Sequence, residues 1–294
     1  QTANIMTAFE PICLEEKPDA VLVVGDVNST IGCGLVASKL GIKLIHVEAG
    51  LRSNDMAMPE EINRVLTDRI SDFLFVTEPS GVDNLKREGV ADEKVFFVGN
   101  VMIDTLLKNL EKAKASTIMA DLGLSPREFC TMTMHRPSNV DNPETLGDLL
   151  GAIETIQADM PIIFPIHPRT RKNIDAFGMT ARVEAMTNLR LVEPLGYLDF
   201  LQLNANARCV LTDSGGLQEE TTVLGTPCIT MRENTERPVT TDIGTNQLVG
   251  VDPAAILAAW DKVKAGDYDN RAVPEKWDGH AATRIAEILV QRLA

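Results

Sequence analysis

The strongest constraint on the fold is the regular alternation of short apolar runs with amphipathic stretches. The runs are continuous in Val, Ile, Leu and Phe, which is typical of parallel strands covered on both faces. Strand-like runs that alternate with helical patterns indicate a doubly wound α/β architecture. Strands are expected at Ala20–Val24, Lys43–Val47, Phe73–Val76, Val95–Val98, Phe129–Met134, Pro161–Ile166, Leu189–Val192, Cys209–Thr212, Pro227–Thr230 and Gln247–Val249. Helices are expected at Ser29–Leu40, Glu60–Ile70, Ser80–Glu88, Asn142–Ala158, Tyr197–Asn206 and Leu217–Leu224.

The length and one charged segment predict two domains. The chain has 294 residues, which suits two domains at about 150 residues each. A Lys- and Ala-rich helical stretch at Leu106–Ser125 separates the two α/β halves. The expected domains are 1–108 and 109–277, followed by a last helix at 278–294. Two α/β domains that face each other bind ligands between their strand ends, so we expect the chemistry on loops that follow strands.

Composition and missing motifs exclude several classes of function. The 28 Lys and Arg residues against 42 Asp and Glu residues give a net charge of −14, which repels nucleic acid. No apolar run in the sequence approaches the roughly 18 residues that span a membrane. The sequence has five widely spaced cysteines and no signal-peptide pattern, which predicts reduced, buried thiols in a cytoplasmic protein. It also lacks the motifs of P-loop NTPases, zincins, α/β-hydrolases and NAD-dependent dehydrogenases.

Two acidic side chains follow strands in the first half. Asp26 comes after the strand at Ala20–Val24, and Glu48 ends the run that begins at Lys43. A carboxylate at the end of a buried strand is costly unless it has a partner or a chemical role. The structural alternatives are turn chemistry for Asp26 and an ion pair of Glu48 with Arg52.

Neighbouring polar residues are less specific. His46 lies inside a strand, where a hydrogen-bonded core histidine is the favoured interpretation. Glu60 and Arg64 begin a helix with a proline in its first turn, which is ordinary helix-start chemistry, and they are spaced for an i, i+4 ion pair. Adjacent helical residues point about 100° apart, so only one of Glu60 and Glu61 faces a given site.

The second half repeats the pattern with basic residues. His135 and Arg136 follow the strand at Phe129–Met134 and suit anion binding or proton transfer. His167 follows the next strand in the same way.

The most specific stretch is TDSGGLQEE. Ser214, Gly215 and Gly216 join a strand to a helix, where backbone N–H groups and the helix dipole can hold a diphosphate. Glu220 lies one turn into this helix and can accept from ribose hydroxyls, and Arg237 on the next loop can clamp a phosphate. The structural alternative is a plain glycine turn with Ser214 as the N-cap.

In their order along the chain, HVEAGLRS, MPEEINR, HRPSN, DSGGLQEE, TERP and GTNQLVG resemble the non-hydrolysing UDP-N-acetylglucosamine 2-epimerases. The resemblance covers essentially the whole chain. It implies a fold like that of glycosyltransferase B enzymes, with two Rossmann-like domains facing a cleft and the last helix packed on the first domain. It also implies interconversion of UDP-GlcNAc and UDP-ManNAc by a homodimer, with no cofactor and no metal.

The resemblance assigns roles to matched positions. Catalytic roles fall to Asp26, Glu48, Glu60, Arg64 and His135. Contacts to UDP fall to Phe200 near the uracil, to Ser214, Gly215 and Gly216 at the diphosphate, to Glu220 at the ribose, to Arg237 on a phosphate, and to His167.

The chemistry explains these residue types. Loss of UDP from C1 of the sugar leaves an oxocarbenium-like centre, which acidifies the C2 proton. A carboxylate removes that proton to give a glycal, and protonation on the other face followed by return of UDP completes the inversion. Such a route needs carboxylates on both sides of the ring and strong stabilisation of departing UDP. Which of Asp26, Glu48 and Glu60 takes the proton is left open.

The chain departs from the family at its beginning. It lacks the strand and the GTRPE-like loop with which the family opens, which predicts a fragment or an incomplete first domain. The alternative functions are a hydrolysing relative that releases ManNAc and UDP, a glycosyltransferase on the same fold, and a UDP-sugar-binding module.

Overall fold

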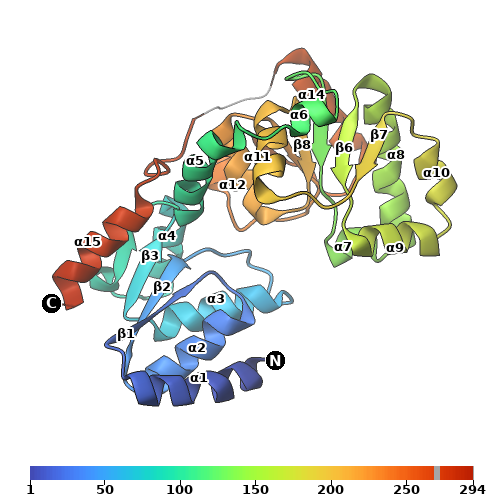
Figure 1. Ribbon diagram of the computed structural model, residues 1–294. Helices are drawn as coiled ribbons and strands as arrows, with labels where there is room; N and C mark the ends of the chain where they lie inside the picture. The colour runs from blue at the N-terminus through green and yellow to red at the C-terminus, as the bar shows by residue number, and fades with distance from the viewer. Residues whose placement is uncertain (268–271, 294) are drawn as a thin grey trace. The chain divides into compact units, whose positions relative to one another are not determined.

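A computed structural model divides the chain into two compact units, each built on its own parallel sheet (Figure 1). The structure describes residues 1–267 and 272–293. Unit 1 consists of Gln1–Asp104 and Glu275–Ala294, and unit 2 consists of Thr105–Pro274. These limits lie within a few residues of the expected domains, 1–108 with 278–294 and 109–277. Ala294, at the end of the expected last helix, is outside the described residues.

Unit 1 has a four-stranded sheet in the order β1-β2-β3-β4, with every neighbouring pair parallel. Its strands are β1 (Ala20–Val24), β2 (Lys43–Ala49), β3 (Phe73–Val76) and β4 (Val95–Phe97). Its helices are α1 (Thr2–Glu16), α2 (Asn28–Lys39), α3 (Pro59–Ile70), α4 (Pro79–Arg87), the short 3₁₀ helix η1 (Asp92–Lys94), the start of α5 (Val101–Ala113), and α15 (Ala281–Leu293).

Successive residues of β2 serve opposite faces of this sheet, because side chains alternate along a strand. Leu44 packs with Cys13 and Val36 from α1 and α2. Ile45 packs in a second cluster that includes Ile285 of α15. The two ends of the chain therefore cover opposite faces of one sheet.

Unit 2 has a six-stranded parallel sheet in the order β10-β9-β8-β5-β6-β7. Its strands are β5 (Cys130–Met132), β6 (Ile162–Pro165), β7 (Leu189–Val192), β8 (Cys209–Thr212), β9 (Cys228–Thr230) and β10 (Asn246–Leu248). Its helices are α6 (Ile118–Asp121), α7 (Pro137–Val140), α8 (Pro143–Asp159), α9 (Pro168–Ala176), α10 (Thr180–Glu184), α11 (Tyr197–Asn206), α12 (Gly215–Leu224), α13 (Val239–Asp242) and α14 (Pro253–Ala265).

The expected α/β class is confirmed, and every expected strand is present with ends moved by at most two residues. Three longer helices, α1, α9 and α14, were not expected from the sequence. The start of α14 carries a clear signal, because the Asp252 side chain accepts from Ala254 N and Ala255 N and Pro253 occupies the first turn. Pro11 inside α1 breaks the usual helical pattern.

The order of strands in unit 2 creates a switch point. From β5 the sheet grows through β6 and β7 on one side, and from β8 it grows through β9 and β10 on the other. Ligands of open α/β sheets bind beyond the carboxyl ends of the strands at such a point. The loops that follow β5 and β8 are therefore the first place to look for a site.

Two glycines beside β2, Gly50 and Gly41, have the same backbone conformation but different surroundings. Gly50 has φ 81°, and a Cβ there would lie 2.5 Å from the carbonyl oxygen of Gly81. Gly41 has φ 72° with nothing within 4 Å of a Cβ. We predict that Gly41→Ala lowers the free energy of unfolding by about 1–2 kcal/mol through backbone strain alone. Gly50→Ala adds the clash and lowers it by about 2–5 kcal/mol.

Urea unfolding of the two variants measures this difference. Equal losses would show that the close approach of Gly50 to Gly81 contributes nothing.

Candidate active site

At the switch point, one buried carboxylate joins the loops that follow β5 and β8. Asp213 Oδ2 accepts the backbone N–H groups of His135 and Arg136, both at 2.8 Å. Its other oxygen, Oδ1, lies 3.0 Å from His135 Nδ1. The His135 side chain stays 41% exposed, and its ring centroid lies 5.8 Å from that of His167. Sequence reasoning assigned no role to Asp213, although its place before SGG at a strand end was the available signal.

The start of α12 has no side-chain cap from Ser214. Ser214 occupies the N-cap position, as the structural alternative expected, but its side chain makes no capping hydrogen bond. Its own N–H donates to Thr212 Oγ1 at 2.9 Å. Unpaired N–H groups and the helix dipole favour negative charge at such an end.

Two arginines, Arg232 and Arg237, pair with acids near the start of α12. Arg237 Nε is 2.7 Å from Glu219 Oε2, and its Nη1 is 3.2 Å from Glu236 Oε1. Arg232, which sequence reasoning missed, pairs with Glu236 Oε2 at 3.0 Å. Burial lowers the pKa of Arg232, while Glu236 raises it. A Cβ at Gly215 would lie 2.8 Å from Glu236 Oε1, so a larger residue there would displace this carboxylate.

Phe200 and Glu220, the residues expected to contact the nucleoside, lie in different surroundings. Phe200 on α11 is half-buried and packs against an apolar cluster that includes Leu203 and Leu217. Glu220 on α12 is buried and accepts a hydrogen bond from Tyr197 Oη at 3.2 Å. Burial raises the pKa of Glu220, against the effect of the Tyr197 hydrogen bond.

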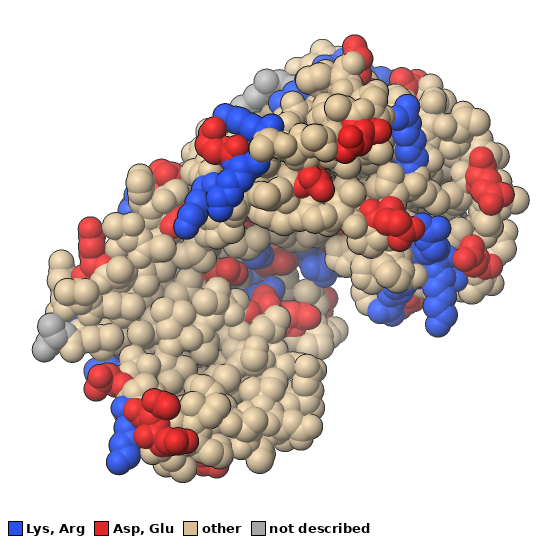
Figure 2. Space-filling view, viewed as in Figure 1, with Lys and Arg blue, Asp and Glu red and all other residues tan. Residues whose placement is uncertain are grey.

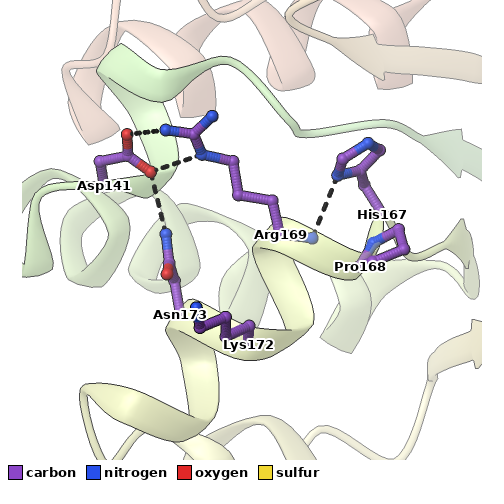
Figure 3. Close-up of a pocket in the computed structure, with 6 residues that line it drawn as sticks. All are labelled: Asp141, His167, Pro168, Arg169, Lys172 and Asn173. Carbon is purple, nitrogen blue, oxygen red and sulfur yellow. Dashed lines mark hydrogen bonds and ion pairs between the residues drawn. The ribbon is translucent and has the colours of Figure 1, made fainter.

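His167 lies at an open pocket of about 620 Å³ where α9 begins. Figure 3 shows Arg169 reaching across to Asp141, and Arg169 Nε donates to Asp141 Oδ1 at 2.7 Å. Arg169 thereby lowers the pKa of Asp141. His167 Nδ1 accepts from Arg169 N at 3.2 Å. The pocket is lined by Asp141, His167, Pro168, Arg169, Lys172 and Asn173.

In unit 1, Arg64 of α3 contacts two acids, Asp26 after β1 and Glu61 in the first turn of α3. Its Nε donates to Asp26 Oδ2 at 2.9 Å, and its Nη1 donates to Glu61 Oε2 at 2.7 Å. The expected ion pair of Arg64 with Glu60 is wrong, because Glu61, one residue on, faces the arginine. Glu60 is half-buried, and its side chain makes no hydrogen bond or ion pair with any residue that the structure describes.

Glu48 adopts an uncommon backbone conformation at the end of β2. Its φ is 71°, in the left-handed region, and the register of β2 against β3 shifts between Val47 and Ala49. A non-glycine residue in this region stores strain and is a frequent feature of functional sites. The shift turns the carboxylate toward the loop after β1, where Glu48 Oε2 lies 3.8 Å from the Cβ position of Gly25. Asp26, Glu48 and Arg64 therefore gather at one edge of the sheet.

His46 is a hydrogen-bonded core histidine, as expected. Its Nδ1 lies 2.7 Å from Asp68 Oδ1, and its Nε2 lies 2.9 Å from the carbonyl oxygen of Gly25. Arg52 pairs with Asp68 and with Glu88, each at 2.7 Å. These contacts tie β2 to α3 and to the loop after β1, both of which carry candidate site residues.

On the face drawn in Figure 2, Lys and Arg side chains are interspersed with Asp and Glu, and no continuous basic surface is visible there. Over residues 1–267 and 272–293, no three His, Cys, Asp or Glu side chains group in a way that could hold a metal ion. None of the helices in this part of the chain is both long and apolar enough to cross a membrane. All five cysteines are free thiols, four of them buried and Cys33 partly exposed.

Comparison with known proteins shows which proteins this chain is related to. The model of the family described as UDP-N-acetylglucosamine 2-epimerase matches residues 1–290. The chain belongs to the UDP-N-acetylglucosamine 2-epimerase family. A family member of that name from Methanococcus maripaludis is 46% identical over 269 residues, which cover 90% of this chain and 73% of the relative.

Two further comparisons agree with membership of the epimerase family. A protein from Pseudomonas aeruginosa named UDP-2,3-diacetamido-2,3-dideoxy-D-glucuronate 2-epimerase is 39% identical and is covered to 80%. The crystal structure of Methanocaldococcus jannaschii UDP-GlcNAc 2-epimerase in complex with UDP-GlcNAc and UDP matches with a TM-score of 0.88 and 42% identity. That match covers 99% of this chain and 80% of the crystallised one.

The contacts of Glu61 predict a pH-dependent contribution to stability. Burial alone would raise the pKa of Glu61, but hydrogen bonds from the Ser53 and Asn54 backbone and from Arg64 outweigh it and lower the pKa. Its contribution is therefore complete above the unfolded-state pKa of about 4.3 and is lost as pH falls through the lower folded-state value. We predict that Glu61→Gln lowers the free energy of unfolding by about 1–3 kcal/mol at pH 7.

This loss should shrink when urea unfolding is repeated at a pH below about 4. A loss that is the same at both pH values would contradict the proposed role of the ionised carboxylate.

The position of Asp213 predicts a graded loss of stability. Asp213→Ala leaves the N–H groups of His135 and Arg136 without their acceptor and should lower the free energy of unfolding by about 2–4 kcal/mol. Asp213→Asn keeps an acceptor oxygen and should cost about 1–2 kcal/mol. Urea unfolding of both variants checks the order, and an Asn variant as unstable as the Ala variant would contradict it.

Proposed function

We propose that this chain interconverts UDP-GlcNAc and UDP-ManNAc by inverting C2 of the sugar through elimination and re-addition of UDP. In this proposal unit 2 binds UDP and stabilises it as a leaving group. Unit 1 supplies carboxylates for proton transfer at C2. We further propose that the enzyme is a cytoplasmic homodimer whose functional domains are 1–108 with 278–294, and 109–277.

The proposed UDP contacts rest on the switch point of unit 2. The start of α12 with Gly215 and Gly216 holds the diphosphate, with Arg237 and the exposed edge of His135 adding positive or hydrogen-bonding groups. His135 Nδ1 faces Asp213 Oδ1 at 3.0 Å, so Nε2 is the ring nitrogen that remains for the ligand. Ser214 contributes its hydroxyl. Phe200, Glu220 and His167 take the nucleoside and outer contacts.

One observation carries the choice of reaction. Arg64 gathers Asp26 beside Glu48, whose strained backbone aims its carboxylate at the same edge of unit 1. Binding of a UDP-sugar does not need an acid at this position. Deprotonation and reprotonation at C2 do need acids placed there. Glu60 lies in the first turn of the helix that carries Arg64, and its side chain makes no hydrogen bond or ion pair within the described chain, so it is the third candidate for proton transfer.

The reaction can be tested by isotope exchange. Incubation with UDP-GlcNAc in D₂O should yield UDP-ManNAc that carries deuterium at C2, detected by NMR and mass spectrometry. Product without deuterium would reject the elimination route. Release of free ManNAc with UDP would favour the hydrolysing alternative.

The acids can be tested one at a time. We predict that Asp26→Asn, Glu48→Gln and Glu60→Gln each lower kcat by about 10²- to 10⁴-fold, because each removes a group that transfers or positions a proton. UDP affinity, measured by calorimetry, should stay within about threefold because the UDP contacts lie in unit 2.

The matched control is Glu93→Gln, which changes an exposed acid of η1 in the same unit and should leave kcat unchanged. If all three site variants kept the control's kcat, the proposed roles in unit 1 would be wrong.

A further inference from the structure

Glu220 has an oxygen that the protein leaves without a partner. The residue is 8% exposed, and its Oε1 accepts from Tyr197 Oη at 3.2 Å. Oε2 makes no hydrogen bond with the described residues and is not closed off from solvent. A largely buried carboxylate in this state is destabilised, in line with the raised pKa of Glu220. A ligand that brings hydroxyl donors would remove the deficit.

Tyr197 is placed to control that carboxylate. It is the first residue of α11, and 42% of its surface is exposed. Phe200, one turn further along the same helix, packs instead against the core of unit 2. Tyr197 is thus the aromatic side chain of α11 that combines solvent exposure with a direct bond to Glu220.

We propose that Tyr197 is a positioning residue of the ribose site at Glu220 and sets its preference for ribonucleotides over 2′-deoxyribonucleotides. This inference rests on the proposed binding of UDP by unit 2. The phenol O–H donates to Oε1 and fixes the rotation of the carboxylate. Oε2 then faces the ligand in a single orientation and accepts from the ribose diol.

The preference for ribonucleotides follows from the 2′-hydroxyl that a deoxyribonucleotide lacks. A site built to receive a hydroxyl rejects the analogue that lacks it, because the bound analogue covers the acceptor without giving it a donor. Without the phenol O–H, the carboxylate can rotate and part of the preference is lost. The ring itself remains in Tyr197→Phe, so apolar contact with the ligand is preserved.

Calorimetry of the full chain with UDP and with 2′-deoxy-UDP tests the proposal. The unmodified chain should bind UDP about 10- to 100-fold more tightly than 2′-deoxy-UDP. Tyr197→Phe should reduce this ratio by about 3- to 10-fold, almost entirely through weaker binding of UDP. In the epimerisation assay the same variant should raise KM for UDP-GlcNAc and leave kcat within about twofold, because the subsite is remote from C2.

Leu198→Ala, which alters the next residue of α11 and also an exposed side chain, is the matched control and should keep the full ratio. Binding of 2′-deoxy-UDP by Tyr197→Phe at the unmodified affinity shows that the variant is folded. An unchanged ratio in Tyr197→Phe would overturn the inference while leaving UDP binding intact. Failure of the unmodified chain to bind UDP would instead overturn the proposed function.

Discussion

Each sheet carries all of its strands in one direction, and the placement of every candidate site residue depends on this. Because parallel strands end at the same edge, loops far apart in the chain converge there. In unit 2 the edge at β5 and β8 is also where the strand order changes direction. In unit 1 the loops after β1 and β2 meet at the corresponding edge. The local sequence determines which side chains these loops carry. The parallel arrangement of the strands brings the loops together.

Buried ionic contacts then fix the loops in place. Asp213 binds two backbone N–H groups of the β5 loop from the end of β8. In unit 1, Asp68 pairs with His46 and Arg52, and Arg64 donates to Asp26 and Glu61. A buried charge is tolerated only where such partners are present, and removal of one partner is expensive. These contacts position Asp26 and the exposed His135.

The sequence predicted the strands and the loop motifs well, because continuous apolar runs and SGG or PEE segments are local signals. It failed where partner choice depends on tertiary geometry. Spacing alone paired Arg64 with Glu60, whereas the turn of α3 presents Glu61. Asp213 and Tyr197 were missed because their partners, His135 and Glu220, lie far from them in the sequence. Arg232 was missed although its partner Glu236 lies only four residues further on. The strained φ of Glu48 arises from a shift in strand register that no local pattern encodes.

The position of α15 has a consequence for biosynthesis. Its Ile285 belongs to the same apolar cluster as Ile45 and Val47 of β2, yet about 240 residues of chain separate them and all of unit 2 lies between. A ribosome therefore releases everything needed for unit 2 before the last helix of unit 1 emerges. Until then one face of the first sheet lacks its cover, so the domain that begins first is the one completed last. Nascent chains arrested before α15 should keep this face accessible to chaperones.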